Sequence, residues 1–200
     1  FEGGLIKYGM PGYEGAIESI RWENGTFPYS TIGAVEPQGI CGSGLIDLLA
    51  ELRRHGQMTP KGVFADKAYE LEIVPEYGIT FSREDGSNLA QAKAANYCGQ
   101  FIALRHFGID PAAVDKLYLA GGFANYVNES NAIDIGFIAN VPIEKVQKVG
   151  NVSLEGAVIM LLSTSKRREI EKLVTTVQHI ELETAPDFFD FFVEGCMFKP

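Results

Sequence analysis

The chain has 200 residues and a mass of 21.9 kDa, with 46% apolar and 22% charged residues, the composition of a globular protein with a sizeable core. Seventeen Lys and Arg residues against 26 Asp and Glu residues give a net charge of −9, which argues against nucleic acid as a partner because backbone binding needs clustered positive charge. No apolar run approaches the roughly 20 residues of a membrane-spanning helix, so we expect a soluble protein with no membrane partner.

Extended segments are predicted for the first third of the chain. Strand-like residues cover 4–8, 16–22 and 26–32, with turn residues between them. Asn24-Gly25 favours positive φ and therefore predicts a hairpin between the second and third segments. We expect these strands to form a small meander.

The next predicted element is a helix that opens within residues 39–44. Gly56 is placed to end this helix, and one helical stripe is formed by Leu45, Leu48, Leu49 and Leu52. Residues 57–83 combine turn residues with strand-like pieces at 70–75 and 78–82. We expect them to be a small β-rich insertion that decorates the core rather than forms it.

A long central helix is predicted from Ser87, a candidate N-cap, to Phe107. Its small residues are expected to allow close approach of another element, along a stripe of Ala92, Asn96, Gly99 and Ala103. Beyond Gly108, predicted strands at 116–120, 145–149 and 177–182 alternate with predicted helices at 128–135, 152–162, 166–174 and 187–194. This alternation implies parallel pairing, so we predict one α/β domain over residues 1–200, a mixed sheet with flanking helices.

Glycine makes up 22 of the 200 residues, above the average of about 7%, and gathers in turns between strands and helices. Glycine lets backbone N–H groups approach an anion, and a helix N-terminus adds a favourable dipole. Three such turns are therefore candidates for phosphate or nucleotide contact.

The first candidate turn is Gly39-Ile40-Cys41-Gly42-Ser43-Gly44. Its glycine order is not that of a dinucleotide fingerprint, and no lysine follows as in a P-loop. The alternative is an ordinary tight turn in which Ser43 caps the helix. Cys41 is either a reactive thiol activated by the helix N-terminus or a small buried residue.

The second candidate turn is Gly121-Gly122, which follows a strand expected to be buried. Ligands of open α/β sheets bind at the carboxyl ends of strands, so this is the best-placed site in the chain; the alternative is a flexible strand end. The third turn is Val149-Gly150-Asn151. There, Asn151 or Ser153 is expected either to contact a ligand or only to cap the next helix, with Gly156 letting that helix lie close to the sheet.

The three cysteines, Cys41, Cys98 and Cys196, are odd in number and widely separated. They predict neither a disulfide framework nor a metal site, and they favour a reducing, cytoplasmic location. No Ser-His-Asp, Cys-His or paired-carboxylate arrangement emerges from the order of residues, so we predict no catalytic residue and no metal ligand.

Taken together and in this order, these turns resemble one family. The matching segments are Phe1-Glu2-Gly3, Gly39 to Asp47, Ala92-Lys93, Tyr118 to Phe123 with Asn125-Tyr126, Val149-Gly150-Asn151, Gly156-Ala157 and the closing Met197-Phe198 with Pro200. The sequence is similar to the C-terminal region of the reductive activators of corrinoid proteins. Their ATPase module belongs to the acetate and sugar kinase, chaperone and actin superfamily.

The resemblance implies a ribonuclease H-like, actin-like ATPase lobe of an iron–sulfur protein. Such a protein uses ATP with Mg²⁺ to reduce the Co(II) corrinoid of a methyltransferase or O-demethylase partner to Co(I). The resemblance also implies a [2Fe–2S] cluster in an N-terminal domain outside these residues, a corrinoid-binding partner and a homodimer. Because the chain opens on Phe1, we expect a C-terminal part of a longer protein. The resemblance places the Asp-Gly-Thr type phosphate motifs upstream of these residues, so we expect this part alone to hydrolyse no ATP.

Individual residues carry over from the family as expected nucleotide contacts. Gly121 and Gly122 match the adenosine-motif glycines of the superfamily, and Gly42, Ser43 and Gly44 match a further family motif. Two other functions stay open at this point. One is a non-catalytic module for dimerisation or for docking the corrinoid protein, and the other is a lobe of a small-molecule kinase of the same superfamily.

Overall fold

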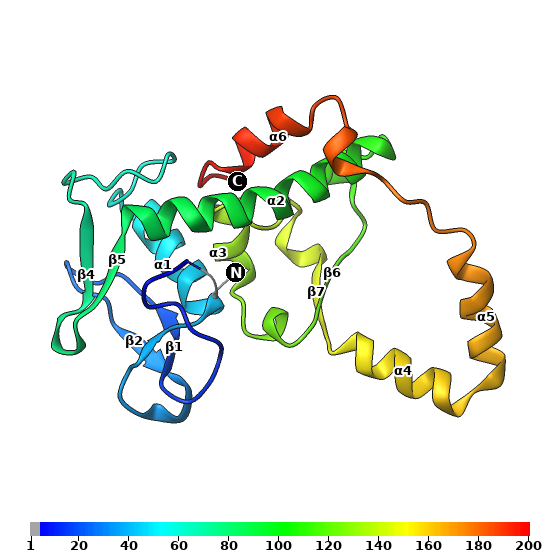
Figure 1. Cartoon of the computed structure of the whole chain (residues 1–200), viewed down its shortest axis with the longest axis horizontal. Helices are drawn as coiled ribbons and strands as arrows, with labels where there is room; N and C mark the ends of the chain where they lie inside the picture. The colour runs from blue at the N-terminus through cyan, green and yellow to red at the C-terminus, as the bar shows by residue number, and fades with distance from the viewer. Residues whose placement is uncertain (1–4) are drawn as a thin grey trace.

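The computed structural model describes residues 5–200 as a mixed α/β fold, in which small sheets are surrounded by helices (Figure 1). The helices are α1 (Gly42–Arg54), α2 (Arg83–His106), α3 (Glu129–Asp134), α4 (Val152–Leu162), α5 (Thr164–Val174) and α6 (Phe188–Gly195). The strands are β1 (Ala16–Ile20), β2 (Tyr29–Thr31), β3 (Gly39–Ile40), β4 (Glu70–Val74), β5 (Ile79–Ser82), β6 (Leu117–Ala120) and β7 (Val146–Gly150).

The first sheet has β1 in the middle, antiparallel to β2 and parallel to β3. The predicted β1–β2 hairpin is confirmed. Glu23 and Thr26 exchange backbone hydrogen bonds of 3.0 and 2.9 Å around Asn24 and Gly25, whose φ angles are 49° and 91°. Both central residues have positive φ, which is the backbone twist that a tight hairpin requires.

The strand expected at residues 4–8 is wrong for residues 5–8. Gly4 lies outside the described residues. Residues 5–8 form turns, and the chain meets the sheet only briefly beyond them. There the Ile40 N–H donates to the Tyr8 carbonyl over 2.8 Å, and the Met10 N–H donates to the Ile40 carbonyl over 3.1 Å. One bridging position, Gly9, is too short a pairing to make a strand.

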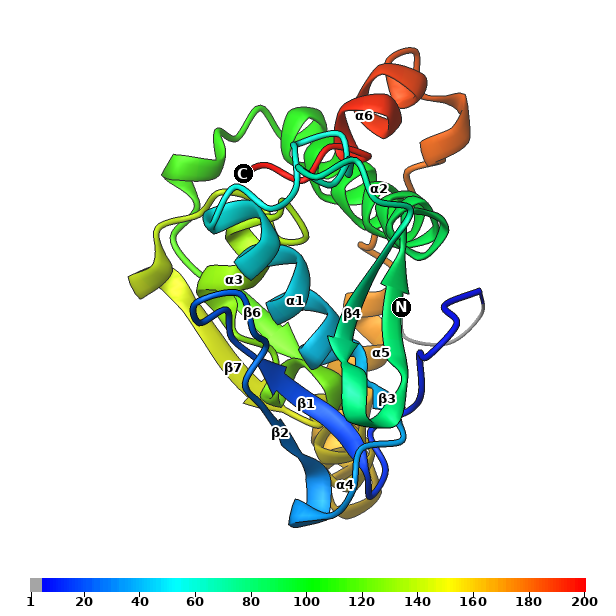
Figure 2. The ribbon, with the colours of Figure 1, turned by 90° about the vertical axis from the view of Figure 1, so that its left-hand side faces the viewer.

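Helix α1 begins and ends as predicted, with Gly56 following it at a φ of 67°. It is buried from Gly42 to Leu52, beyond the leucine stripe, because β1 packs on one side of it and α3 on another (Figure 2). Gly44 permits this close packing, since a Cβ at that position would collide with the carbonyl oxygen of Ile17 on β1.

The β4–β5 hairpin forms where strands were predicted in residues 57–83. The expected β-rich character is confirmed, but the expectation that the segment only decorates the core is wrong. Its buried side chains in the core cluster are Met58, Phe64, Ile73, Val74, Ile79 and Phe81. The rings of Phe64 and Phe81 approach with centroids 6.3 Å apart, and this contact between loop and hairpin helps to fix the segment in place.

Helix α2 starts at Arg83, four residues before the predicted start at Ser87. Ser82 is the N-cap: its hydroxyl accepts from the Asp85 N–H over 3.1 Å, while the Ser82 N–H donates to the Asp85 carboxylate over 2.8 Å. This capping box satisfies donors at the helix start that would otherwise be unpaired. Ser87 is exposed inside the helix.

Helix α2 is central as predicted and packs along α6 (Figure 1). The predicted contact stripe is wrong, because Ala92 and Asn96 are exposed and Gly99 and Ala103 are only half-buried. The buried positions are Asp85, Gly86, Leu89, Ala90, Lys93, Ala94, Tyr97, Cys98 and Ile102. The small buried residues of α2 are therefore Gly86, Ala90, Ala94 and Cys98 rather than the predicted four. Close approach of α6 does occur there, since a Cβ on Gly195 would lie 2.9 Å from the Ala94 Cα.

Strands β6 and β7 are parallel as predicted, with Leu117 opposite Val146. The expectation of a buried β6 is wrong: Tyr118 is 57% exposed, and Leu117 and Leu119 are only half-buried. Within residues 5–200, β7 is the only strand that pairs with β6, so one edge of β6 is open.

Helices α4 and α5 project away from the other helices (Figure 1). No residue of either is buried, although α4 is almost wholly apolar. The strand predicted at 177–182 is wrong. In the described part of the chain no strand pairs with this segment, which returns towards α2 and ends in a 3-10 turn at Leu182–Thr184.

Candidate functional site

The first glycine turn delivers the N-terminus of α1 to the sheet. The Cys41 N–H donates to the Ile17 carbonyl over 3.1 Å, which extends the pairing of β3 with β1 into the turn. Cys41 is the N-cap residue, yet its side chain makes no capping hydrogen bond. Ser43 is not the cap that one interpretation expected; its hydroxyl donates to the Glu18 carbonyl over 2.8 Å.

The second glycine turn ends β6. Gly121 has a φ of 101°, which favours glycine, and its N–H donates to the Gly150 carbonyl over 2.8 Å. Gly122 has ordinary helical angles and opens the 3-10 turn Phe123–Asn125. A Cβ on either glycine would meet no atom within 4 Å, so the space beside this turn is open.

The third glycine turn supports the second rather than standing apart from it, because Gly150 accepts the Gly121 hydrogen bond. Asn151 caps α4 through a 3.1 Å bond from the Leu154 N–H, as one interpretation predicted. Gly156 does not bring α4 close to the sheet, since a Cβ there would also meet no atom within 4 Å.

The first and second turns share one cavity of about 340 Å³. Its lining residues are Gly12, Glu18, Ile32, Cys41, Gly42, Ser43, Gly122, Phe123 and Tyr126. The structure thus brings Gly42 and Ser43 together with Gly122, whereas Gly44 and Gly121 are not among the lining residues. Gly44 serves the packing of α1 on β1, and Gly121 shapes the turn.

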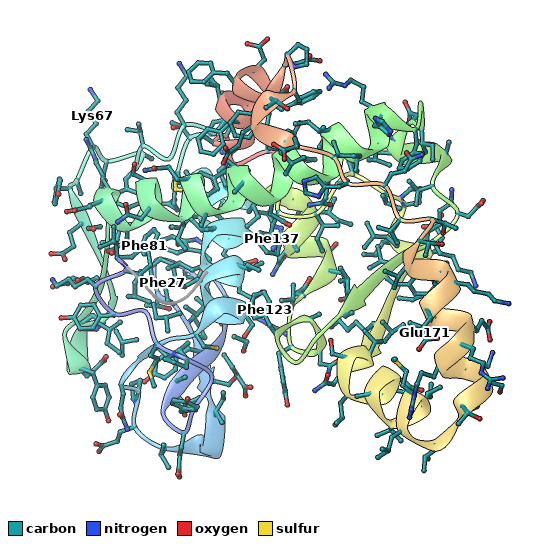
Figure 3. All side chains as sticks on the ribbon, turned by 45° about the vertical axis from the view of Figure 1, so that its right-hand side comes forward. Phe27, Lys67, Phe81, Phe123, Phe137 and Glu171 are labelled. Atoms are coloured by element: carbon teal, nitrogen blue, oxygen red, sulfur yellow. The ribbon has the colours of Figure 1, made fainter. Side chains whose placement is uncertain are left out.

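Sequence reasoning did not single out Glu18, Phe123 or Tyr126 as site residues. Phe123 and Tyr126 follow directly on the second turn, so their place in the chain was a usable signal. Phe123 also meets Phe137 edge to face, with ring centroids 6.4 Å apart (Figure 3). Glu18 reaches the cavity only because β1 runs beside the start of α1, which local sequence does not reveal.

A second, more polar cavity of about 650 Å³ adjoins the first, and Glu18 and Tyr126 line both. On its wall Asp47 of α1, 8% exposed, accepts a 2.7 Å hydrogen bond from the side-chain amide of Asn131 on α3. Burial raises the pKa of Asp47, and the hydrogen bond from Asn131 opposes that rise.

The cysteines lie apart from any ligand cluster. All three thiols are free, and no group of three or more His, Cys, Asp or Glu residues in the described part of the chain is placed to hold a metal ion. Cys41 is 5% exposed, as expected for a small buried residue, with its Sγ 3.3 Å from the Ser43 Oγ. Burial raises the pKa values of Cys98 and Cys196.

Among residues 5–200, no helix has both the length and the apolar character needed to cross a bilayer. The cavity volume falls within the range of about 300 to 1,000 Å³ that is usual for small-molecule sites. An uncapped helix N-terminus, the open space at Gly122 and aromatic rings at its wall are features that suit an anionic ligand with a flat ring system.

Comparison with known proteins decides the family. The family described as the C-terminal domain of RACo, the ASKHA domain, matches residues 1–200. The chain belongs to this RACo C-terminal domain family. ASKHA stands for the acetate and sugar kinase, chaperone and actin superfamily, so the actin-like mixed α/β fold and the resemblance to corrinoid activators are confirmed.

Two relatives of this RACo-type domain show how much of a longer protein it represents. The corrinoid activation enzyme RamQ of Eubacterium limosum is 32% identical over 222 residues, covering 98% of this chain and 37% of RamQ. A solved structure of a reductive activator for corrinoid, iron-sulfur protein matches with a TM-score of 0.86 and 34% identity, covering 99% of this chain and 35% of that chain. The chain therefore spans little more than a third of the length of these relatives.

Proposed function

We propose that this chain is the ATP-binding C-terminal domain of a reductive activator that returns the Co(II) corrinoid of a methyltransferase partner to Co(I), as in O-demethylase systems. Its family supports the proposal, because both relatives are named as activators of corrinoid proteins. The observation that carries the nucleotide part is the shared cavity, where the N-terminus of α1 meets the Gly122 turn.

Within this proposal, ATP with Mg²⁺ occupies the space between the two turns. Gly42 and Ser43 lie at the positive end of the α1 dipole, where backbone N–H groups favour phosphate oxygens. Gly122 leaves open space for a ribose or base. Gly121 and Gly44 contribute by shaping the turn and by holding α1 against β1.

The electron is proposed to come from a [2Fe–2S] cluster in another domain of the full-length protein. Cys41, Cys98 and Cys196 form no ligand group in the part that the structure describes, so they are not proposed to hold it. ATP binding acts by shifting the population of an open and a closed form, and the two forms engage the corrinoid partner differently. A cytoplasmic location accords with the free thiols.

The test of the nucleotide site is a titration with Mg²⁺ and ATP by calorimetry. Gly122→Val places a branched side chain in the open space and is expected to weaken ATP binding at least about tenfold, or roughly 1.4 kcal/mol. Gly156→Val is the matched control, because it adds the same side chain to open space on α4. Equal affinities in the two variants, or binding of a corrinoid protein by a chain that binds no nucleotide, contradict the assignment.

A second role rests on α4. Its large apolar side chains are exposed and include Leu154, Leu161 and Leu162, although apolar helices are normally buried. We propose that this face contributes to a homodimer of the activator or to docking of the corrinoid protein. Analytical ultracentrifugation with and without the corrinoid protein separates the two, because only the first predicts association of the chain with itself.

A further inference from the structure

A buried polar bridge joins the helices that follow the two glycine turns. The Asn131 side chain on α3 donates from Nδ2 to Asp47 Oδ1 over 2.7 Å, and its Oδ1 accepts from Arg54 Nη2 over 2.7 Å. The same guanidinium group binds Asp134 Oδ2 over 2.7 Å and also bonds to Glu51. In the part of the chain that the structure describes, every side-chain hydrogen bond between α1 and residues 121–135 involves Asn131 or Asp134.

The bridge is anchored to the sheet as well as to the helices. The Ile20 N–H points to Asp47 Oδ2 at 3.4 Å, and the Trp22 N–H donates to Glu51 Oε2 over 2.8 Å. Asn131 is only 7% exposed and Asp47 only 8%, so the hydrogen bond between them is shielded from water, where the loss of a partner costs most.

The bridge lies close to both walls of the candidate nucleotide cavity. Asp47 is four residues after Ser43, one helical turn along α1, so the two residues share a face of that helix. Asn131 lies on the first helix after Gly122, and the intervening Val127 is fixed in the core at 2% exposure. A movement of α3 relative to α1 would therefore change the gap between Ser43 and Gly122.

We propose that Asn131 is a positioning residue that sets the spacing of the two glycine turns by pairing Asp47 and Arg54 at once. This inference deepens the proposed nucleotide function and rests on it. Asparagine suits the place because it offers a donor to a carboxylate and an acceptor to a guanidinium from one planar group. Aspartate would put a second negative charge beside Asp47, and leucine would leave both partners without their bond.

The test exchanges the two partners. Asn131→Leu removes the bridge, and Asn131→Ser, whose hydroxyl is too short to reach both partners, does so with less disturbance of the core. The double variant Asp47→Asn with Asn131→Asp restores the amide–carboxylate pair in reverse and leaves a carboxylate facing Arg54. Ser82→Ala, at the remote start of α2, is the control for a general loss of stability.

Hydrogen exchange of amides in residues 39–45 and 120–127 is the main readout, with ATP affinity as the second. We expect Asn131→Leu and Asn131→Ser to speed exchange in both turns about tenfold and to weaken ATP binding, and the double variant to restore both. Emission of Trp22, the single tryptophan, gives a further signal because Trp22 lines the adjoining polar cavity.

Two outcomes overturn the inference. The first is that Ser82→Ala, compared at matched stability, speeds amide exchange in the two turns as much as the Asn131 variants do. The second is that amide exchange in the double variant stays as fast as in Asn131→Leu. If exchange follows the bridge but the unaltered protein binds no ATP, the proposed function fails while the positioning role of Asn131 stands.

Discussion

Lys93 Nζ donates a hydrogen bond to the backbone carbonyl oxygen of Met197 over 2.8 Å, from a side chain that is fully buried in α2. The same ammonium group also bonds to the carbonyl of Gly195 at the end of α6. Close by, Arg53 of α1 donates from Nε to the Phe198 carbonyl over 2.8 Å. Two cations thus hold the last residues of the chain against α1 and α2 (Figure 1).

Replacing Lys93 by methionine keeps the length and apolar stem of the side chain but leaves two carbonyl groups without their donor. Burial of the charge opposes the gain from these bonds, so the net loss is expected to be moderate, about 1 to 3 kcal/mol of unfolding free energy. Urea denaturation measures it, and Lys172→Met on the exposed surface of α5 is the control. A Lys93→Met protein as stable as the control contradicts the role of this contact.

The same lysine predicts a dependence of stability on pH. Burial lowers the pKa of Lys93 from 10.5 to about 8. Between these values the unfolded chain binds more protons than the folded one, so stability rises with pH across this window, and the cost of the buried charge is fully present below it. The unfolding free energy of the unaltered protein relative to Lys93→Met should grow by up to about 3 kcal/mol from pH 7 to pH 10.5. Both proteins carry Cys196→Ser, so that the nearby thiol is absent from the comparison. A difference in unfolding free energy that stays flat from pH 7 to pH 10.5 contradicts the prediction.

Local signals predicted a large part of the fold. Asn24-Gly25 marked the β1–β2 hairpin, Asn151 marked the start of α4, and the alternation after Gly108 gave the parallel pairing of β6 with β7. Each depends on neighbouring residues alone. The strand expected at 177–182 failed because a strand also needs a partner, which depends on the path of the whole chain.

Residues of the candidate site were singled out one by one, but the sequence did not show how they come together. Gly42, Ser43 and Gly122 were each singled out, yet only tertiary packing shows that they line one cavity. The same packing explains Gly44, whose missing Cβ makes room for the Ile17 carbonyl. Asn131 gave no sequence signal, because its partners Asp47 and Arg54 lie far away in the chain.

The corrected start of α2 gives a test of its own. Ser82→Ala removes the capping hydroxyl and is expected to lower the unfolding free energy by about 1 kcal/mol. Ser87→Ala, the same change at the start predicted from sequence, should alter stability by less than about 0.5 kcal/mol because Ser87 is exposed within the helix. Thermal denaturation of both variants decides between the two starts, and a larger loss of stability in Ser87→Ala would favour a helix that begins at Ser87.

Two glycines of the candidate site should respond differently to the same substitution. Gly44→Ala drives a Cβ into the Ile17 carbonyl and is expected to cost about 1 to 3 kcal/mol, because α1 must move away from β1. Gly122→Ala enters open space in a helical conformation and should change stability by less than about 0.5 kcal/mol. Chemical denaturation compares them, and equal losses would show that the second turn is packed as tightly as the first.

The exposed apolar face of α4 predicts association that depends on protein concentration. Leu161 is 77% exposed on α4, and Leu5, far from α4 in sequence, is also 77% exposed, so the two leucines form a matched pair. Leu161→Glu is expected to shift the protein towards the monomer in sedimentation velocity, because a charge cannot be buried in an apolar contact without a partner. Leu5→Glu should leave the distribution unchanged. If the two variants sediment alike, α4 is not the contact between chains.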